Sequence, residues 1–218
     1  RLNPRGGTYS IMLGDEDGGG EVSMLTHVAK ITALKPYFTY DFAVVFNDPS
    51  HPVQEQPFFD VQFLDSNGLK IPSCGNYFVI TGGAVPGFIT TTGTSGFGTW
   101  RYKPWTRITV DLSTYVGQDI TVLFTVGDCG YGGHGARAYI DGSCFKPLIT
   151  KTQDCKGISL KADSGYLSYQ WYAGTPLVTI AGATNIDYTI SGPGIYRVKL
   201  ISENGCTLYI DTLINSLY

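Results

Sequence analysis

The 218-residue sequence has few charged residues and no apolar run long enough to span a membrane. Asp, Glu, Lys and Arg together make up 15% of the chain, whereas about 25% is usual for a globular protein. The net charge is −3 and the basic residues form no cluster, which excludes the electrostatic surface that nucleic acids require. We therefore expect neither nucleic acid binding nor direct membrane insertion.

Helical periodicity and the common catalytic motifs are also missing. No stretch keeps an apolar period of 3.6 residues over three turns. The sequence contains no Gly-x-Ser-x-Gly motif, no GxxxxGK[ST] loop and no HExxH. The Gly- and Thr-rich segment 90–98 predicts an exposed loop between strands. We expect a protein that is not an enzyme; a pair of carboxylates assembled only in space, as in glycoside hydrolases, is the alternative that the sequence leaves open.

Residues that favour strands and turns are abundant: there are 28 Gly, 15 Tyr and 11 Phe. Within residues 1–146, apolar side chains alternate with smaller or polar ones in five segments, which is the period of a strand with one buried face. These segments are 38–46, 59–63, 108–112, 120–126 and 136–140. Strands separated by long Gly- and Pro-rich connections predict a jelly-roll-like β-sandwich.

Residues 147–218 predict a second, smaller β-sandwich that begins with a short linker at 147–153. The expected strands are 158–162, 169–172, 194–201 and about 207–213. Trp171 occupies the position of the core tryptophan of an immunoglobulin-like sandwich, and Asn204-Gly205 predicts a type I′ hairpin. The expected fold class is therefore all-β, with a jelly-roll-like sandwich followed by a small Ig-like sandwich.

Five cysteines are dispersed along the chain: Cys74, Cys129, Cys144, Cys155 and Cys206. None forms a CxxC pair, which excludes a zinc ribbon or dithiol redox motif. Dispersed cysteines in a chain of this composition predict disulfides made in an oxidising compartment. The favoured pairs are Cys155–Cys206 and Cys74–Cys129, while Cys129–Cys144 and Cys74–Cys144 stay open. The odd number leaves one thiol free or paired outside the chain.

Carboxylates and glycines alternate in a turn near the N-terminus, between Asp15 and Glu21. Such oxygen ligands suit a hard cation. We expect a structural Ca²⁺ held by some of Asp15, Asp17, Glu21 and Asp141, because Asp141 ends the last strand expected in residues 1–146. The alternative is a solvated acidic turn.

Two of the three histidines, His51 and His134, lie beside Gly- and Pro-rich loops. With Asp48 and Asp128 they form a candidate metal or ligand site. Because neither HxH nor HExxH spacing is present, the favoured interpretation is that these histidines are hydrogen-bonded structural residues.

Aromatic and basic residues alternate from Trp100 through Tyr102 to Trp105. Flat rings stack on the apolar faces of sugars, so this stretch is a candidate glycan platform, together with Tyr131 and His134. The favoured alternative is that Trp100 and Trp105 close the edge of the sandwich core, since tryptophan is usually largely buried.

Several motifs within residues 1–145 point, in combination, to one family. They are Ile-Met-Leu-Gly-Asp at 11–15, Gly-Glu at 20–21, Tyr-Asp-Phe-Ala-Val-Val-Phe at 40–46, Asp-Pro-Ser-His at 48–51, Glu-Gln-Pro-Phe-Phe at 55–59, Asp-Cys at 128–129, Gly-Gly-His at 132–134 and Ala-Tyr-Ile-Asp at 138–141. This region resembles a large module of giant surface proteins of Bacteroidota, present in gliding-motility adhesins and other cargo of the type IX secretion system. Residues 147–218 resemble, more generically, the Ig-like or PKD-like repeats of such proteins.

The resemblance implies a non-catalytic adhesin fragment, exported by the type IX secretion machinery to the cell surface or the extracellular medium. Its partner would be a glycan or another cell-surface ligand bound by loops of the sandwich. Two alternatives are a carbohydrate-binding accessory module of a secreted polysaccharide-degrading enzyme and a structural spacer in a stalk. No signal peptide opens the sequence and no sorting domain is recognisable, so we expect a fragment of a longer polypeptide.

Overall fold

The computed structural model describes residues 2–5, 8–82, 87–92, 99–144, 147–154 and 157–216. Sixteen strands make up the regular structure of these ranges, together with two short 3₁₀ turns, η1 (Val53–Glu55) and η2 (Ser113–Tyr115). Within the same ranges no helix has the length and apolar character needed to cross a bilayer. The predicted all-β fold class is confirmed.

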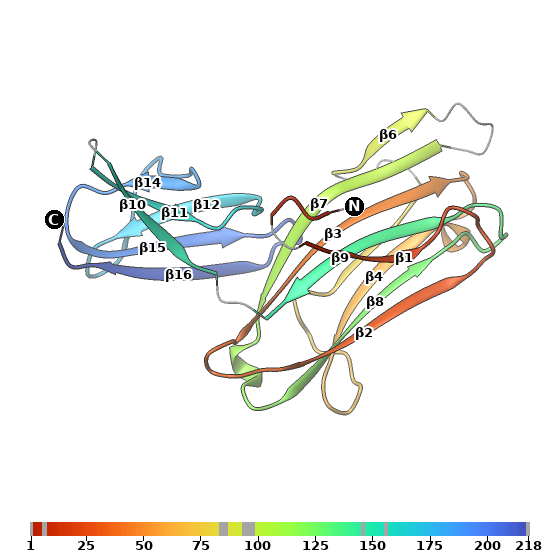
Figure 1. Ribbon diagram of the computed structural model, residues 1–218, viewed down its shortest axis with the longest axis horizontal. Helices are drawn as coiled ribbons and strands as arrows, with labels where there is room; N and C mark the ends of the chain where they lie inside the picture. The colour runs from red at the N-terminus through yellow and green to blue at the C-terminus, as the bar shows by residue number, and fades with distance from the viewer. Residues whose placement is uncertain are drawn as a thin grey trace.

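The first sandwich is built from strands β1 to β9, which form two facing antiparallel sheets (Figure 1). The five-stranded sheet has the order β1 (Ile11–Gly14), β9 (Ala136–Ser143), β3 (Tyr37–Asp48), β7 (Thr99–Asp111) and β6 (Ile89–Thr92). The four-stranded sheet has the order β2 (Val22–Lys30), β8 (Asp119–Gly127), β4 (Phe58–Leu64) and β5 (Tyr77–Ile80). Apart from the edge strand β6, the orders 1-9-3-7 and 2-8-4-5 are those of a jelly roll.

The core of this sandwich is aromatic and lies between the two sheets. Phe42 and Phe59, from opposite sheets, have ring centroids 5.1 Å apart, and Tyr40 meets Phe124 edge-on at 5.5 Å. The Tyr40 hydroxyl donates to the Gly75 carbonyl at 2.7 Å, so its burial leaves no polar atom unpaired. Burial of each such ring contributes about 1.5–3 kcal/mol to the free energy of folding. This gain favours the strand conformation in segments where apolar residues alternate, because it places all of them on the buried face.

A β-bulge interrupts the pairing of β3 with β7. Phe42 pairs with Thr106 whereas Val44 pairs with Lys103, so that two residues of β7, Pro104 and Trp105, lie opposite one residue of β3. A proline lacks the N–H that a central ladder requires, and the bulge accommodates it.

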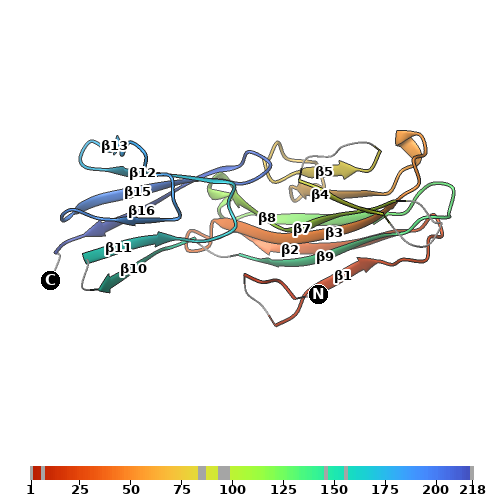
Figure 2. The same ribbon diagram turned by 90° about the horizontal axis from the view of Figure 1, so that it is seen from above.

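The second sandwich is built from strands β10 to β16 (Figure 2). One sheet has the order β10 (Ile149–Asp154), β11 (Gly157–Ala162) and β14 (Asp187–Thr189). The other has the order β13 (Val178–Thr179), β12 (Ser168–Ala173), β15 (Gly194–Ile201) and β16 (Thr207–Ile214). Trp171 is fully buried and its indole N–H donates to the Asn185 carbonyl at 2.9 Å. The Tyr196 hydroxyl donates back to the Gly192 carbonyl at 2.7 Å, as in the tyrosine corner of immunoglobulin-like domains.

Two local predictions for this part of the chain are wrong. Most of the expected linker 147–153 is the strand β10, which pairs with β11 over its whole length. The turn before β16 is a hairpin but not of type I′, because only Gly205 has a positive φ, of 85°. The Gly205 N–H instead donates to the Ser202 carbonyl, as in a three-residue loop whose last residue is left-handed. The predicted boundary at 146 falls beside residues 145–146, which lie outside the described ranges.

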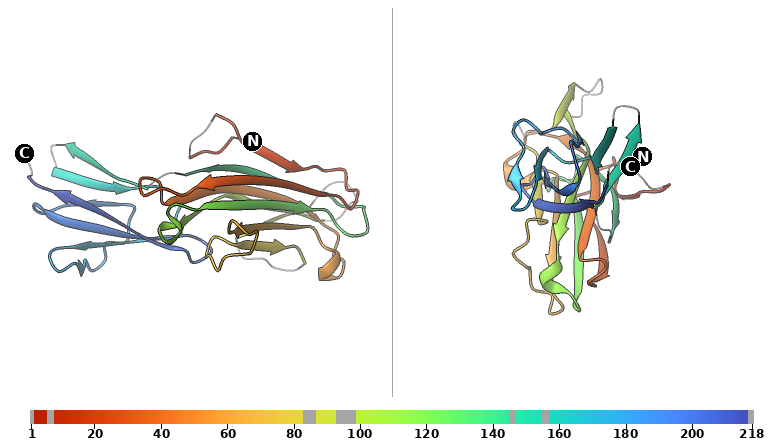
Figure 3. Two further views of the ribbon diagram at one scale, coloured as in Figure 1. Left: turned by 90° about the horizontal axis from the view of Figure 1, so that it is seen from below. Right: turned by 90° about the vertical axis from the view of Figure 1, so that its left-hand side faces the viewer.

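The two sandwiches lie end to end along the long axis of the molecule (Figures 1 and 3). We call residues 202–206, which join β15 to β16, the junction hairpin. It contacts the first sandwich at several points: the Glu203 carboxylate pairs with the ammonium of Lys103, and the Asn204 amide donates to the Cys74 carbonyl. The side chain of Cys206 belongs to the hydrophobic core cluster of the first sandwich.

A disulfide joins Cys74 to Cys206, with their Cα atoms 5.2 Å apart. Both predicted pairs are therefore wrong, because the bond runs between the sandwiches and not within them. Cys129 and Cys144 are free thiols. They lie beyond opposite ends of the eight-residue strand β9, about 25 Å of strand length apart, so the alternative pair Cys129–Cys144 is also excluded. Cys155 lies outside the described residues.

Candidate functional site

The four carboxylates predicted to bind Ca²⁺ do not converge. Gly14, which precedes the acidic turn, pairs with Arg137, whereas Asp141 lies four residues further along β9, a separation of about 13 Å. Asp141 instead accepts a hydrogen bond from the Asn3 amide at 3.1 Å and lies opposite Asp41. Asp141 therefore cannot share an ion with the turn.

The acidic turn itself is held by bonds of its own. The Asp17 N–H donates to the Asp15 carboxylate at 3.0 Å, and Glu16 forms an ion pair with Arg137 at 2.7 Å. Asp15, Asp17 and Glu21 are exposed. These bonds anchor the turn to the rest of the fold, and Ca²⁺ binding by its three carboxylates stays a prediction.

The predicted aromatic stretch lies on the outer face of the five-stranded sheet. Trp100 pairs with Asn47 and Tyr102 pairs with Val45, whereas Val44 and Phe46 face the core. Because side chains alternate across a strand, Trp100 and Tyr102 point away from the core and toward solvent. Both are partly exposed.

Neither Trp100 nor Trp105 belongs to either hydrophobic core cluster, so the favoured expectation that they close the core is wrong. Tyr139 extends the same outer face, since it pairs with Ala43 on one side and with Met12 on the other. Trp105 lies in the bulge, where its carbonyl accepts a hydrogen bond from Arg5 at 2.7 Å. We call Trp100, Tyr102 and Tyr139 the aromatic strip.

The other two predicted ligand residues, Tyr131 and His134, lie in the β8–β9 loop and not on the strip. The Tyr131 ring meets the His51 ring edge-on with centroids 4.8 Å apart, and His134 meets His51 at 5.2 Å. The Asn47 N–H donates to the Gly135 carbonyl at 3.1 Å. We call His51, Tyr131 and His134, together with Cys129, the loop cluster. Since Asn47 also pairs with Trp100, this cluster and the strip lie at the same end of the sandwich.

Cys129 completes the loop cluster. Its sulfur lies 3.3 Å from Nδ1 of His134, and one donor atom from each of His51, Cys129 and His134 lies within 4.8 Å of the others. Cys129 is fully buried and the two histidines are partly exposed. Among the residues that the structure describes, these three form the one group of His, Cys, Asp or Glu side chains with such convergence.

The environment of the cluster favours the neutral form of His134. Burial lowers the pKa of His134, the neighbouring His51 lowers it further, and Asp48 partly offsets this effect. Nδ1 of His51 is buried and has no hydrogen-bond partner within the described part of the chain. Imidazole nitrogens are common metal ligands, so this atom is a candidate donor to a metal ion.

The two aspartates that sequence reasoning grouped with these histidines have other roles. The Asp128 carboxylate accepts the N–H groups of Gly19, Glu21 and Ala136 at 3.0–3.3 Å and so anchors the acidic turn to the β8–β9 loop. Asp48 is buried and pairs with Arg101 at 2.5 Å. Cys129 is the partner that the sequence reasoning missed, because it was assigned to a disulfide; its spacing of five from His134 in a glycine-rich loop was the available signal.

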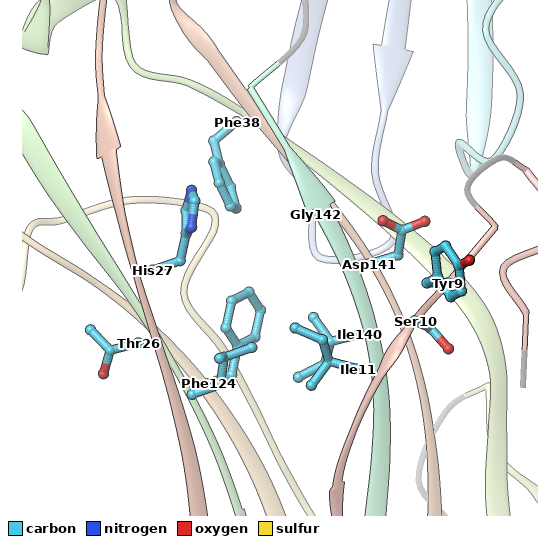
Figure 4. Close-up of a pocket in the computed structure, with 11 residues that line it drawn as sticks. Tyr9, Ser10, Ile11, Thr26, His27, Phe38, Phe124, Ile140, Asp141 and Gly142 are labelled. Carbon is cyan, nitrogen blue, oxygen red and sulfur yellow. The ribbon is translucent and has the colours of Figure 1, made fainter.

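A separate pocket of about 230 Å³ opens where the two sheets part, between β1 and β2. Figure 4 shows Ile11 and Ile140 pointing toward Phe124, with His27 beside Phe38. Asp141 points to the other side of β9. The polar groups of the described lining therefore do not converge on one point, and this pocket lacks the arrangement of a catalytic centre.

Comparisons with known proteins identify no family for this chain. No family model matches, and no curated protein matches. Among solved structures, the glycoside hydrolase domain of Endo-D from Streptococcus pneumoniae R6 is matched at 11% identity with a TM-score of 0.27 over 94% of this chain. A lipase of Bacillus licheniformis in its propeptide form is matched at 8% identity with a TM-score of 0.24 over 95%. The chain spans 33% and 41% of these two proteins, and similarity at this level carries no functional argument.

Proposed function

We propose that this protein is a non-catalytic, extracellular binding module that recognises a polysaccharide through the aromatic strip. The observation that carries the proposal is that Trp100, Tyr102 and Tyr139 share the outer face of one sheet while both tryptophans of the first sandwich stay out of the core. Burying such rings in a core is the usual arrangement. Their presence on a partly exposed face therefore favours a ligand.

The spacing of the rings suits an extended ligand. Trp100 and Tyr102 are two residues apart on one strand, which places them about 7 Å apart. Tyr139 lies two strands away and is offset by two residues along the strand direction, because its partner on β3 is Ala43 whereas that of Tyr102 is Val45. The strand spacing and the rise per residue together place it about 12 Å from Tyr102. A flat face with rings at such intervals fits a chain of several sugar units better than a single one.

The disulfide supports an extracellular location, because such bonds persist in oxidising compartments. Together with the resemblance of residues 1–145, it supports our further proposal of a surface adhesin exported by the type IX secretion system. An accessory module of a secreted polysaccharide-degrading enzyme would use the same strip. The full reading frame distinguishes that alternative from an adhesin, because only the enzyme would carry a catalytic domain. A stalk spacer would bind nothing.

The test is binding of the purified chain to a glycan array, followed by titration of any hit with Trp100→Ala, Tyr102→Ala and Tyr139→Ala variants. Loss of one stacking ring should weaken binding at least about tenfold, equivalent to about 1.4 kcal/mol. Phe78→Ala is the matched control, since Phe78 is 61% exposed on the four-stranded sheet and should have no effect. Glycan binding that survives all three strip variants would refute the assignment, and an array without hits would favour the spacer.

A further inference from the structure

We infer that His51, Cys129 and His134 form a zinc site at the loop end of the first sandwich, distinct from the aromatic strip. The donor set is two imidazoles and one thiol. Zn²⁺ is commonly bound by histidine nitrogen and cysteine sulfur, whereas Ca²⁺ and Mg²⁺ take oxygen ligands. The chemistry of the cluster therefore selects a borderline-soft ion over the calcium expected from the acidic turn.

The distances fit tetrahedral coordination. With Zn–S of about 2.3 Å and Zn–N of about 2.05 Å, the sulfur and nitrogen ligands of a tetrahedral ion lie about 3.5 Å apart. The observed separation of the Cys129 sulfur and Nδ1 of His134 is 3.3 Å. The third donor, on His51, lies within 4.8 Å of both, so binding of one ion by all three draws the His51 ring toward the other two ligands.

Hydrogen bonds to backbone carbonyls fix the two loops that carry these ligands. The Cys129 N–H donates to the His134 carbonyl at 3.0 Å, and the Gly130 N–H donates to the Glu55 carbonyl at 3.0 Å. The Gln56 amide donates to the carbonyl of His51 at 2.7 Å. The ligands are therefore preorganised before an ion arrives, which lowers the ordering cost of binding.

Burial gives a second, independent reason for a ligand here. Cys129 is fully buried, and Nδ1 of His51 is a buried polar atom without a partner in the described residues. Leaving such an atom unpaired is unfavourable, and coordination through this nitrogen would satisfy it. A cavity of about 330 Å³ lined by Asp48, His51 and Arg101, among other residues, adjoins the cluster. The cavity brings solvent to the His51 side of the cluster, and water is the fourth ligand of zinc sites that have three protein ligands.

The test uses the full chain with its disulfide intact, freed of metal by chelation. Zn²⁺ is titrated in competition with a chromophoric chelator, and Co²⁺ is added in parallel as a spectroscopic substitute. We expect one Zn²⁺ per chain and a thiolate-to-cobalt charge-transfer band. Cys129→Ser should abolish the band and weaken Zn²⁺ binding at least about a hundredfold. His51→Gln and His134→Gln should weaken binding as well, while His27→Gln, which alters an exposed residue of β2, should not.

Alkylation of thiols provides a readout that does not depend on variants. Because Cys129 is fully buried, it reacts with iodoacetamide only when its loop opens locally. Zn²⁺ should slow that reaction, as measured by peptide mass spectrometry over time, but not the reaction of Cys144, the other free thiol. Failure of Zn²⁺ to bind the folded chain would overturn the proposal. So would binding that is unchanged in Cys129→Ser, a measurable rate of Cys129 alkylation that Zn²⁺ does not slow, or binding of Cu⁺ without Zn²⁺.

Discussion

Reduction of the Cys74–Cys206 disulfide should destabilise the molecule more than the loss of any single contact at its junction. The bond closes a loop between cysteines that are 132 positions apart. Cys74 is exposed whereas Cys206 is buried, so a phosphine reductant would approach the bond from the Cys74 side. Reduction changes no side-chain volume, which makes it a cleaner perturbation than substitution of Cys206 in the core.

The magnitude follows from the size of the loop. In the chain-entropy treatment, closing a loop of this length removes about 17 cal/mol/K from the unfolded chain, or about 5 kcal/mol at 25 °C. The junction also has apolar packing, since Tyr37 packs against the core of the second sandwich. Its polar contacts include the Lys103–Glu203 ion pair and the hydrogen bond between Thr109 and the Tyr166 hydroxyl at 2.8 Å. Each such contact contributes about 1 kcal/mol. The covalent bond is therefore expected to dominate.

The assay is urea unfolding followed by tryptophan fluorescence, with and without reductant. Trp171 reports on the core of the second sandwich, and Trp100 and Trp105 report on the first. With a slope of about 2–3 kcal/mol/M, a loss of about 5 kcal/mol corresponds to a midpoint shift of roughly 2 M. The reduced protein should also show separate transitions for the two sandwiches.

Mass spectrometry after alkylation should confirm that the bond is open in the reduced sample. Cys144→Ser, which removes a thiol outside the bond, should match the parent in both conditions. A urea midpoint that moves by less than about 0.5 M with the bond demonstrably open would refute the reasoning, because closing the loop would then add almost nothing to the stability of the two sandwiches.

Three further predictions concern single side chains. Glu203→Gln leaves the ammonium of Lys103, which is 2% exposed, without its anion and should lower the unfolding free energy by about 1–3 kcal/mol. Lys103→Met, which removes the buried charge, should lower the unfolding free energy by less. Urea curves in which Lys103→Met is the more destabilising of the two variants would contradict this. Burial raises the pKa of Tyr166 to about 12, while an unfolded tyrosine titrates near 10. The contribution of this group to the unfolding free energy should therefore be constant below pH 10 and fall as the pH rises to 12, and Tyr166→Phe should reduce that fall. Urea titrations at each pH that give the same profile for both proteins would contradict this. Trp171→Phe removes packing and leaves the Asn185 carbonyl without its donor, so calorimetry should show a loss of about 2–3 kcal/mol, and a loss under 1 kcal/mol would contradict the core assignment.

The strands were predictable because their information is local. In β3, a buried face requires an apolar side chain at every second position, and Phe42, Val44 and Phe46 meet this requirement in the sequence itself. The same holds for β8 and β15. Strand β10 was not predicted because its residues Thr150, Lys151 and Thr152 place polar side chains on both faces of the strand. It forms through pairing with β11 and not through burial of an apolar face.

The disulfide was not predictable because its partners meet only through the packing of two sandwiches. Cys206 lies next to the turn of the junction hairpin, and nothing local shows that this turn reaches the core of the other sandwich. The same limitation affected the residues proposed to bind zinc. His51 and His134 were grouped correctly from their loops, but Cys129 was discounted as soon as a bond to Cys74 was expected. The absence of a central bridge in the second sandwich was predictable, since Val198 follows Tyr196 by two residues where antibody domains have cysteine.

The covalent link between the sandwiches also determines how the molecule would respond to pulling. A force applied through the two chain ends enters at the N-terminal strands and crosses from Cys74 to Cys206 without passing through the intervening segment. That segment, 132 positions long, would otherwise release roughly 450 Å of extended chain. With the bond closed, the tether stays short under load; with the bond open, the same tension would draw out the whole length, so the redox state of one cystine sets the extensibility of the protein.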